Sequence, residues 1–254
     1  MLNIENVTKS FGGLMAVNDV TLQLDPTGIA GLVGPNGSGK STLFHLITGF
    51  YKLDGGAVYF KERRISGLSP HIISRMGLVR TFQQTRVLPF LTAQENLMAA
   101  SPGQAGEHLA SVFLQPRKVK LDENKNREKA GKILEILNLK SLSHHLAGRL
   151  SFGQQKLLEL GRVLMAKPKM ILLDEPTAGI NPTLIRQLVA VIKGLSCRGI
   201  RIFLIEHNMP LVAEICTKVF VMDSGSLIFS GTPAEARRNS RVIEAYLGRE
   251  DHAA

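Results

Sequence analysis

The sequence lacks the features of a zinc protein and of a membrane-spanning protein. Only two cysteines occur, Cys197 and Cys216, and neither belongs to a CxxC pair or a His-rich cluster of the kind that holds zinc. The longest uninterrupted apolar run, residues 188–192, is far shorter than the ~18 residues that indicate a membrane span. No internal repeat or low-complexity tract is present. We therefore expect buried or half-buried thiols in a chain that does not itself cross a bilayer.

An export signal is also missing from the start of the chain. Glu5 and Lys9 lie where a signal peptide has its apolar stretch, so a cytosolic protein is expected. The 254 residues are 44% apolar, which is enough to fill a hydrophobic core and argues against disorder of the whole chain. We expect one domain over residues 1–254, with room for an inserted lobe.

Positive charge exceeds negative charge, with 31 Lys and Arg against 21 Asp and Glu, a formal net charge of +10. Residues 61–80 and residues 117–132 each carry a net +4. Nucleic acid, an anionic membrane surface and negatively charged ligands all remain open as partners on this basis.

The hydrophobic pattern indicates an α/β fold. Continuous apolar runs at 29–33, 170–173, 202–205 and 219–222 predict strands buried on both faces in a largely parallel sheet. Residues 2–4 and 20–24 alternate instead, which predicts a small N-terminal antiparallel sheet. Strand signals vanish between residues 84 and 166, where helical spacing at 93–100, 126–137 and 152–166 predicts an inserted helical lobe. Residues 101–124 are expected to form a mobile loop or connecting helix.

The segment GPNGSGKS, residues 34–41, matches the pattern GxxxxGK[ST] between an apolar strand and a helical segment at 40–50. Glycines let backbone N–H groups converge on phosphates, Lys40 is placed to reach the terminal phosphates, and Ser41 offers a hydroxyl to Mg²⁺. The flanking strand and helix argue against an ordinary glycine-rich turn. The predicted phosphate-binding residues are Gly34, Pro35, Asn36, Gly37, Ser38, Gly39, Lys40, Ser41 and Thr42.

Two carboxylates end the apolar strand at 170–173. Asp174 is placed to hold the Mg²⁺ shell, and Glu175 could polarise an attacking water as general base. Taken alone, an acidic pair after a strand is more often a helix cap with a solvated neighbour. Together with the phosphate loop, it predicts hydrolysis of a nucleoside triphosphate.

The segment LSFGQQ, residues 150–155, begins a predicted helix shortly before the acidic strand. At a helix start, Ser151 and Gly153 expose a hydroxyl and a backbone N–H to an anion. Taken alone, the segment is equally consistent with a simple helix cap. With the two preceding motifs it resembles the signature of ABC-type ATPases, usually written LSGGQ, with Phe152 in place of the first glycine. The resemblance implies that Ser151, Gly153 and Gln154 contact the γ-phosphate of ATP.

The resemblance extends to further positions. It implies that Phe11 stacks on adenine, where a core Phe of the small sheet is the alternative, and that His207 is the switch histidine on the γ-phosphate. Gln83 resembles the glutamine that joins the core to the helical lobe and contacts Mg²⁺ and the attacking water. The adjacent Gln84 could be mistaken for it. Asn181 stands where many members carry an aspartate.

Taken over nearly the whole chain, the resemblance implies an ABC-type P-loop ATPase with a parallel-sheet core, a small N-terminal antiparallel β subdomain, an inserted helical subdomain at 84–166 and a family-specific tail at 232–254. Within that family, AGINP, LIEHNM and the ending GTPAEARRNSRVIEAYLG look most like the ATP-binding subunit of branched-chain amino-acid importers. Relatives that move urea or lipopolysaccharide share such features.

The resemblance also implies partners and a location. ATP with Mg²⁺ would bind between two ATPase subunits, as a homodimer or as a heterodimer with a related subunit. Integral-membrane permease subunits would be contacted directly and a solute-binding protein indirectly, at the cytoplasmic face of the cell membrane.

Two rival functions are weighed against transport. A soluble ABC ATPase acting on DNA or ribosomes suits the +10 charge, but such proteins generally carry two ATPase halves, long coiled coils or zinc modules, so no nucleic-acid partner is expected. A regulatory module that does not turn over ATP is disfavoured because both Glu175 and His207 are present. We interpret the basic stretches 61–80 and 117–132 as solvated faces. The alternative is that Arg117, Lys118 and Lys120 are attracted to an anionic membrane leaflet.

Overall fold

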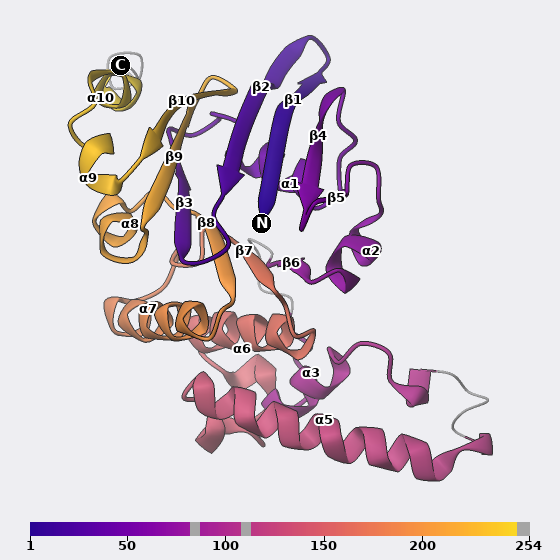
Figure 1. Cartoon of the computed structure of the whole chain (residues 1–254). Helices are drawn as coiled ribbons and strands as arrows, with labels where there is room; N and C mark the ends of the chain where they lie inside the picture. The colour runs from indigo at the N-terminus through magenta and orange to yellow at the C-terminus, as the bar shows by residue number, and fades with distance from the viewer. Residues whose placement is uncertain (82–86, 108–112, 248–254) are drawn as a thin grey trace. The chain divides into compact units, whose positions relative to one another are not determined.

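The computed structural model describes residues 1–81, 87–107 and 113–247 (Figure 1). The chain divides into two compact units. The first comprises Met1–Arg80, Lys169–Pro176 and Ile192–Ala254, and the second comprises Thr81–Pro168 and Thr177–Val191. The insert predicted at 84–166 lies within the limits of the second unit, which also takes in residues 177–191.

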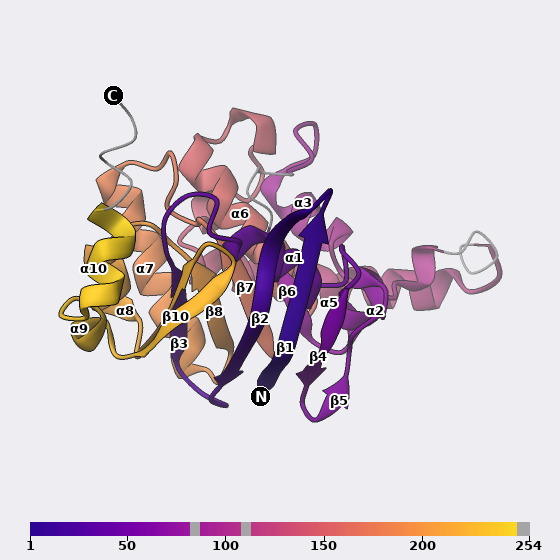
Figure 2. The same ribbon diagram turned by 90° about the horizontal axis from the view of Figure 1, so that it is seen from above.

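A four-stranded antiparallel sheet in the first unit contains the N-terminus. Its strands are β1 (Leu2–Phe11), β2 (Leu14–Leu24), β4 (Gly55–Phe60) and β5 (Arg63–Arg64), in the order β2-β1-β4-β5. Figure 2 shows β2, β1 and β4 side by side. Along β1 and β2, buried apolar residues alternate with more exposed residues, so one face of the sheet is buried. The predicted small antiparallel sheet is confirmed.

A six-stranded sheet forms the α/β core of the same unit. Five of its strands run parallel and β10 is antiparallel to β9, in the order β10-β9-β3-β8-β7-β6. The strands are β3 (Ile29–Val33), β6 (Leu78–Arg80), β7 (Met170–Asp174), β8 (Arg201–Ile205), β9 (Lys218–Asp223) and β10 (Ser226–Gly231). Every residue of β3, β7 and β8 is buried, so their apolar runs are continuous. The four strands predicted here are confirmed, and the short β6 and the half-exposed β10 gave no periodic signal.

One hydrophobic cluster joins both sheets of the first unit to the helix α1 (Lys40–Ile47). Phe44 of α1 packs with its ring centroid 5.1 Å from that of Phe203 in β8. The helix ends earlier than the predicted residue 50, because Gly49 adopts a left-handed conformation (φ 75°) that breaks it. The remaining helices of this unit are α2 (Pro70–Arg75), α8 (Met209–Ile215), α9 (Pro233–Ala236), α10 (Ser240–Leu247) and the end of α7 (Pro182–Cys197).

The second unit is helical throughout its described residues, apart from turns and one isolated bridge. Its helices are α3 (Ala93–Ala99), α5 (Pro116–Ile136), α6 (Phe152–Met165) and the first part of α7, with short 3-10 turns at Ala105–Glu107, Lys140–Leu142 and Ala147–Arg149. Gly161 of α6 lets these helices approach closely, because a Cβ there would lie 2.7 Å from Leu137 Cδ1 and 2.9 Å from Leu97 Cδ2. The core of this unit therefore forms where α3, α5 and α6 meet.

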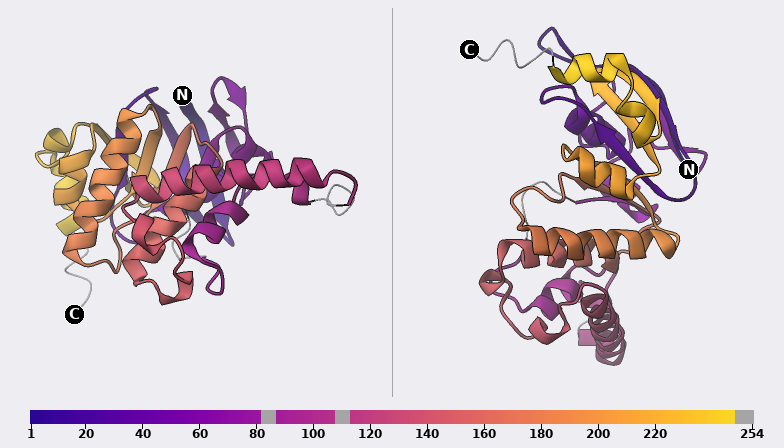
Figure 3. Two further views of the ribbon diagram at one scale, coloured as in Figure 1. Left: turned by 90° about the horizontal axis from the view of Figure 1, so that it is seen from below. Right: turned by 90° about the vertical axis from the view of Figure 1, so that its left-hand side faces the viewer.

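Helix α5 is longer than the sequence pattern predicted (Figure 3, left). It begins at Pro116, ten residues before the predicted start at 126, so residues 116–124 follow the connecting-helix alternative given for that segment. Its buried residues, Ala130, Ile133 and Leu134, all lie in its C-terminal half. The first half buries no apolar face, so hydrophobic periodicity carries no signal there, although Pro at the first turn favours a helix start.

No helix in the described part of the chain is both long enough and apolar enough to span a membrane.

Candidate functional site

A cavity of about 520 Å³ in the first unit collects residues that lie far apart in the sequence. Besides predicted residues, its lining includes Leu14, Met15 and Ala16 from β2 and Ser224 and Gly225 after β9. These five gave no motif, since their place depends on the pairing of strands. The sequence-predicted residues that the cavity brings together are Phe11, Asn36, Gly37, Gly39, Lys40, Ser41, Thr42, Glu175 and His207.

The loop between β3 and α1 depends on glycine for two different reasons. Gly34, Gly37 and Gly39 have φ values of 146°, 77° and 96°. A Cβ on Gly34 would lie 2.0 Å from the carbonyl oxygen of Met222, and one on Gly39 would lie 2.2 Å from that of Ala16. Space is open around Gly37, where the left-handed backbone alone favours glycine. The loop therefore packs closely against the backbone of β9 at Met222 and of β2 at Ala16.

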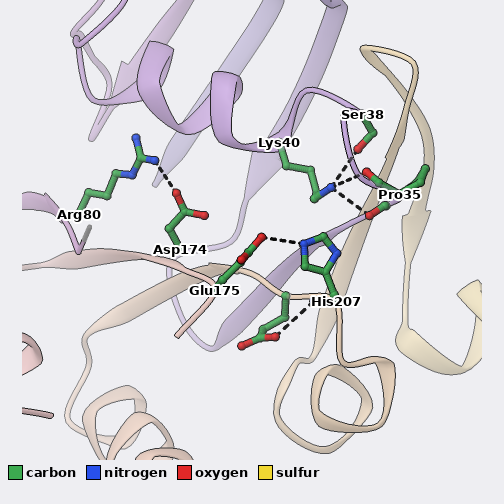
Figure 4. A network of polar contacts seen from close by, with 9 residues as sticks. Pro35, Ser38, Lys40, Arg80, Asp174, Glu175 and His207 are labelled. Atoms are coloured by element: carbon green, nitrogen blue, oxygen red, sulfur yellow. Dashed lines mark hydrogen bonds and ion pairs between the residues drawn. The ribbon is translucent and has the colours of Figure 1, made fainter. Parts of the chain in front are cut away.

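Lys40 points back into this loop. Its ammonium donates hydrogen bonds to the carbonyl oxygens of Gly34 (2.9 Å) and Pro35 (2.7 Å) and to the hydroxyl of Ser38 (3.1 Å) (Figure 4). The residue is only 5% exposed. The N-cap residue of α1, Gly39, has no side chain that could cap the helix, and the first turn contains no acidic residue. A buried cation and the amide end of a helix therefore meet at one place, which favours an anion.

Asp174, at the end of β7, forms a buried ion pair that the sequence did not predict. Its Oδ2 accepts a hydrogen bond from Arg80 Nη2 at 2.5 Å, and the two side chains are 2% and 6% exposed (Figure 4). Arg80 also lies over the ring of Phe44, 5.7 Å from its centroid. Parallel pairing of β6 with β7 brings the arginine there. In the sequence, the only indication of this ion pair was the basic residue that ends the short apolar run at 78–80.

The second oxygen of Asp174 is buried without a partner. Within the described residues, Oδ1 of this carboxylate has no hydrogen bond, and the same holds for Nε and Nη1 of Arg80. An unsatisfied carboxylate oxygen in an apolar setting is unfavourable unless a ligand completes it. Carboxylate oxygen is the donor type that Mg²⁺ takes, so the residues present fit that ion.

Glu175 and His207 form a second polar pair, at the ends of neighbouring strands. His207 Nε2 lies 2.7 Å from Glu175 Oε1 (Figure 4). Asp174 is paired with Ile205 in the parallel register of β7 and β8, so the residues that follow each strand meet. Glu175 has a left-handed backbone (φ 46°) and donates its N–H to the carbonyl of Ile205 at 3.0 Å. Both side chains line the cavity.

Phe11 belongs to the cavity and not to the core of the small sheet. It is 43% exposed, so the alternative of a core residue is wrong. Tyr51 packs against it edge to face, with ring centroids 5.3 Å apart, and the ammonium of Lys9 lies 5.3 Å from its centroid. An aromatic ring is therefore held at the cavity on the side of β1.

The titration of His45, on α1, is perturbed. Burial lowers the pKa of its imidazole, the positive charge of Arg80 lowers it further, and Asp174 acts in the opposite direction. The ring also stacks near Tyr51, at 4.8 Å between centroids. His45 consequently stays neutral to lower pH than an exposed histidine does.

Ser151, Gly153 and Gln154 lie in the second unit, at the start of α6. They form a capping box, in which Ser151 Oγ accepts the N–H of Gln154 (3.3 Å) and Gln154 Oε1 accepts the N–H of Ser151 (2.9 Å). A Cβ on Gly153 would lie 2.4 Å from Leu184 Cδ1, so a larger residue here would require the side chain of Leu184 to move. The helix-cap reading of this segment is therefore confirmed, and a role toward ATP stays a prediction.

Two further predicted positions lie elsewhere. Asn181 accepts the N–H of Leu184 at 3.0 Å and so caps the start of α7. Gln83, and its neighbour Gln84, lie outside the described residues.

A strand, a glycine loop, a helix and an acidic strand end define the P-loop class of nucleotide-binding proteins. The family model described as "ABC transporter" matches residues 17–178, and this chain belongs to that family. A second family model, "Branched-chain amino acid ATP-binding cassette transporter", matches residues 226–252. The predicted ABC-type α/β fold is confirmed by both the sheets and these matches.

Curated relatives match almost the full chain. The high-affinity branched-chain amino acid transport ATP-binding protein BraF of Pseudomonas aeruginosa is 40% identical over 250 residues, covering 98% of each chain. The corresponding protein LivG of Escherichia coli is 38% identical over 249 residues, again with 98% of each covered.

Solved structures of ATP-binding cassettes resemble the whole chain as well. A nucleotide-free cassette from an ABC transporter superposes with a TM-score of 0.85 at 38% identity, covering 98% of this chain and 99% of the other. The ADP conformation of such a cassette gives a TM-score of 0.82 at 36% identity, with the same coverage.

Proposed function

We propose that this protein is the ATP-hydrolysing subunit of a membrane transporter that imports branched-chain amino acids. The observation that carries the proposal is one cavity lined by the phosphate loop, by an aromatic ring and by the Glu175–His207 pair. The choice of branched-chain amino acids as solute rests on the names of relatives that are 38–40% identical over nearly the full chain. It also rests on the family match at residues 226–252.

ATP would bind with its phosphates in the loop and its adenine near Phe11. The ammonium of Lys40 would then exchange the carbonyls of Gly34 and Pro35 for phosphate oxygens, a stronger charge-assisted contact. Backbone N–H groups of the loop, including those of Gly37 and Gly39, would surround the phosphates. The remaining phosphate-contacting residues are Pro35, Asn36, Ser38, Ser41 and Thr42.

Ser41 and Asp174 would hold Mg²⁺, with Gln83 as a third residue toward it. Asp174 Oδ1 is buried and has no hydrogen-bond partner among the described residues, while Arg80 fixes the other oxygen of the same carboxylate. When bound, the ion supplies neutralisation of the charge on the phosphates. The hydroxyl of Ser41 lines the cavity at the start of α1.

Glu175 would act as general base on the attacking water. Its Oε1 already accepts or shares a hydrogen bond with His207 Nε2 at 2.7 Å, which restrains the carboxylate in the cavity. The water would lose its proton to Glu175 while His207 turns toward the γ-phosphate. Positioning of the water, with stabilisation of the phosphoryl charge by Lys40, would provide most of the acceleration.

A second ATPase subunit would complete the site. Ser151, Gly153 and Gln154 of one subunit would contact the γ-phosphate held by the other, in a homodimer or in a heterodimer with a related subunit. Because the γ-phosphate would touch this segment only in the closed dimer, ATP binding would close the pair and hydrolysis would reopen it.

The dimer would act at the cytoplasmic face of the cell membrane as a peripheral component. Integral-membrane permease subunits would bind it directly, and a solute-binding protein would deliver the amino acid on the other side of the membrane. The names of the relatives as transport ATP-binding proteins support this arrangement.

Purification from detergent-solubilised membranes tests the proposal. We expect integral-membrane proteins to co-purify with the tagged chain, and vesicles reconstituted with them and with the binding protein to accumulate leucine when ATP is enclosed on the side of this subunit. ATP hydrolysis without any retained integral protein would contradict a role in transport. Uptake of another solute but not of leucine would contradict the proposed substrate.

A further inference from the structure

We propose that a hollow in the second unit, between α5 and the end of α6, binds a phosphate-bearing anion. The hollow measures about 590 Å³. Four lysines line it and define what we call the lysine pocket: Lys125, Lys129, Lys132 and Lys167. The inference is independent of the transport activity proposed above, because the pocket shares no residue with the nucleotide cavity.

Helical spacing gathers three of the lysines. Lys125, Lys129 and Lys132 are four and three residues apart on α5, so they share one face of that helix. Lys167 comes from the turn after α6, where its left-handed backbone (φ 50°) ends the helix. Two segments far apart in the sequence thus contribute four lysines to the lining of one hollow.

Side-chain hydrogen bonds fix the opposite wall of the pocket. Ser101 Oγ donates to Asn126 Oδ1 at 2.8 Å, and Asn126 Nδ2 donates to Gln104 Oε1 at 3.1 Å. Gln104 in turn donates to the carbonyls of Met98 and Ser101, at 2.9 and 3.0 Å. The loop after α3 is therefore tied to α5 without any bound ligand, which reduces the entropy lost on binding.

The positive charges of the lysine pocket are not balanced by its own residues. Its single acidic residue, Glu128, pairs with Lys132 at 2.6 Å. Lys129 donates to the carbonyl of Met165 at 2.5 Å. Over the part of the chain that the structure describes, the side-chain ammonium groups of Lys125 and Lys167 have no hydrogen-bond or ion-pair partner. Four lysines against one glutamate leave a net +3 facing the hollow.

A helix dipole accounts for only part of this cluster. Of these four ammonium groups, the one on Lys129 bonds the last carbonyl of α6, that of Met165, so the helix end accounts for one of the four lysines. On a fully solvated face all four lysines would be exposed, whereas only Lys125, Lys132 and Lys167 are exposed and Lys129 is half-buried. Burial and, next, the charge of Lys167 lower the pKa of Lys129. A bound anion would relieve this repulsion among like charges.

Phosphate matches the pocket better than a carboxylate does. A phosphate group carries up to two charges and three acceptor oxygens, and several compact ammonium groups can donate to it at once. Free phosphorylated metabolites and the headgroups of anionic phospholipids present the same chemistry. The experiment below separates these two sources.

Methyl NMR of the full-length protein provides a probe in each site. Met165 lines the lysine pocket and Met15 lines the nucleotide cavity, so ¹³C-labelled methionine methyl groups report the two sites separately. We expect inorganic pyrophosphate to shift the Met165 resonance. In the variant Lys125→Gln/Lys167→Gln, pyrophosphate affinity measured at Met165 should fall by about tenfold, from loss of two charge-assisted hydrogen bonds, while the shift at Met15 is retained.

The matched control removes the same charge from the same helix outside the pocket. Lys118→Gln/Lys120→Gln changes two exposed residues of α5 that do not line the hollow, and it should leave the affinity at Met165 unchanged. An equal loss in both variants would show a diffuse charge effect and overturn the proposal.

Co-sedimentation with lipid vesicles shows whether the bound phosphate belongs to a lipid headgroup or to a soluble compound. Vesicles of phosphatidylglycerol in phosphatidylcholine are compared with vesicles of phosphatidylcholine alone. A loss of sedimentation in the pocket variant but not in the control variant identifies the lipid headgroup as a ligand. A response to pyrophosphate alone identifies a soluble phosphorylated anion. If neither pyrophosphate nor anionic vesicles distinguish the two variants, the pocket does not bind phosphate and the proposal is wrong.

Discussion

At the scale of single residues, Glu175 combines a sparsely populated backbone conformation with the side-chain contact for which we propose a catalytic role. Its φ of 46° is uncommon for a residue with a Cβ, and its carboxylate meets His207 at 2.7 Å. Such strain persists where the surroundings fix the residue, and it is common at catalytic positions. The parallel register of β7 and β8 provides that fixation.

Replacement of Glu175 by Gln should stop turnover without preventing binding. The amide keeps the size of the side chain but cannot take a proton from water, so we expect ATP hydrolysis to fall by about a hundredfold or more. Affinity for ATP should stay within about twofold. Phosphate release and equilibrium binding of a fluorescent ATP analogue measure the two quantities, and unchanged turnover would contradict the role of general base.

The Arg80–Asp174 pair predicts a large effect on stability. Arg80→Met would leave a buried carboxylate without its partner, and removal of one member of a buried pair costs about 3–5 kcal/mol of unfolding free energy. The double variant Arg80→Met/Asp174→Asn should recover much of that loss, since no uncompensated charge remains. Urea unfolding measures both variants. A double variant no more stable than Arg80→Met would show that the pair matters through packing and not through charge.

The close approach of Gly34 to Met222 predicts a position that tolerates no side chain. Gly34→Ala would place a Cβ 2.0 Å from a backbone oxygen, so the loop must shift and nucleotide affinity should fall by at least about tenfold. Gly103→Ala is the control: its φ of 69° is strained too, but no atom of the described residues lies within 4 Å of a Cβ placed there. Calorimetric titration with ATP should show no change for the control, and equal losses would mean that steric contact is not the cause.

At the scale of elements, the start of α3 shows how a cap stabilises a helix of the second unit. Thr92 Oγ1 accepts the N–H of Glu95 (3.2 Å), and the Glu95 carboxylate accepts the N–H (2.8 Å) and the hydroxyl (2.7 Å) of Thr92. These bonds, the backbone one first, lower the pKa of Glu95 below its ordinary 4.5. The stabilisation is therefore present above pH 4.5 and is lost as the pH falls through the lowered folded-state value.

We expect Thr92→Ala to lower the free energy of unfolding by about 1 kcal/mol at pH 7. Its deficit relative to the parent protein should shrink as the pH falls below 4.5, because protonated Glu95 no longer favours the cap. Ser69→Ala is the control for loss of an N-cap hydroxyl, as Ser69 occupies the N-cap of α2 without a side-chain cap bond and its hydroxyl instead lies 3.0 Å from His71 Nδ1. Thermal unfolding at several pH values checks both, and a deficit independent of pH would contradict the contribution of Glu95.

Elements also show which parts of the fold a sequence can predict. The fully buried strands β3, β7 and β8 were evident because burial on both faces demands unbroken apolar runs. The first half of α5 was not evident, since only its second half contacts the core. Strand β6 was also missed, because three residues are too few to display a period.

At the scale of the whole molecule, each chain holds one phosphate loop and one signature segment, so the proposed site requires two subunits. With ATP and the Glu175→Gln variant, a homodimer should appear at twice the 27.8 kDa mass of the chain, and ADP should not support it. Light scattering after size-exclusion chromatography measures the mass. A chain that stays monomeric with ATP would contradict a homodimer and favour the heterodimer, which addition of the related subunit would then form.

The phosphate loop and the acidic strand end could be predicted from the residues alone, and a helix cap at Ser151 was one of two interpretations. In each case backbone conformation and chemistry are set by residues within one turn or one strand end. Tertiary contacts were needed to show that Arg80 holds Asp174, that Phe11 is exposed at the cavity, and that Lys167 joins the lysines of α5. These contacts link segments far apart in the chain, and their partners are chosen by strand register and helix packing, which the pattern of neighbouring residues does not encode.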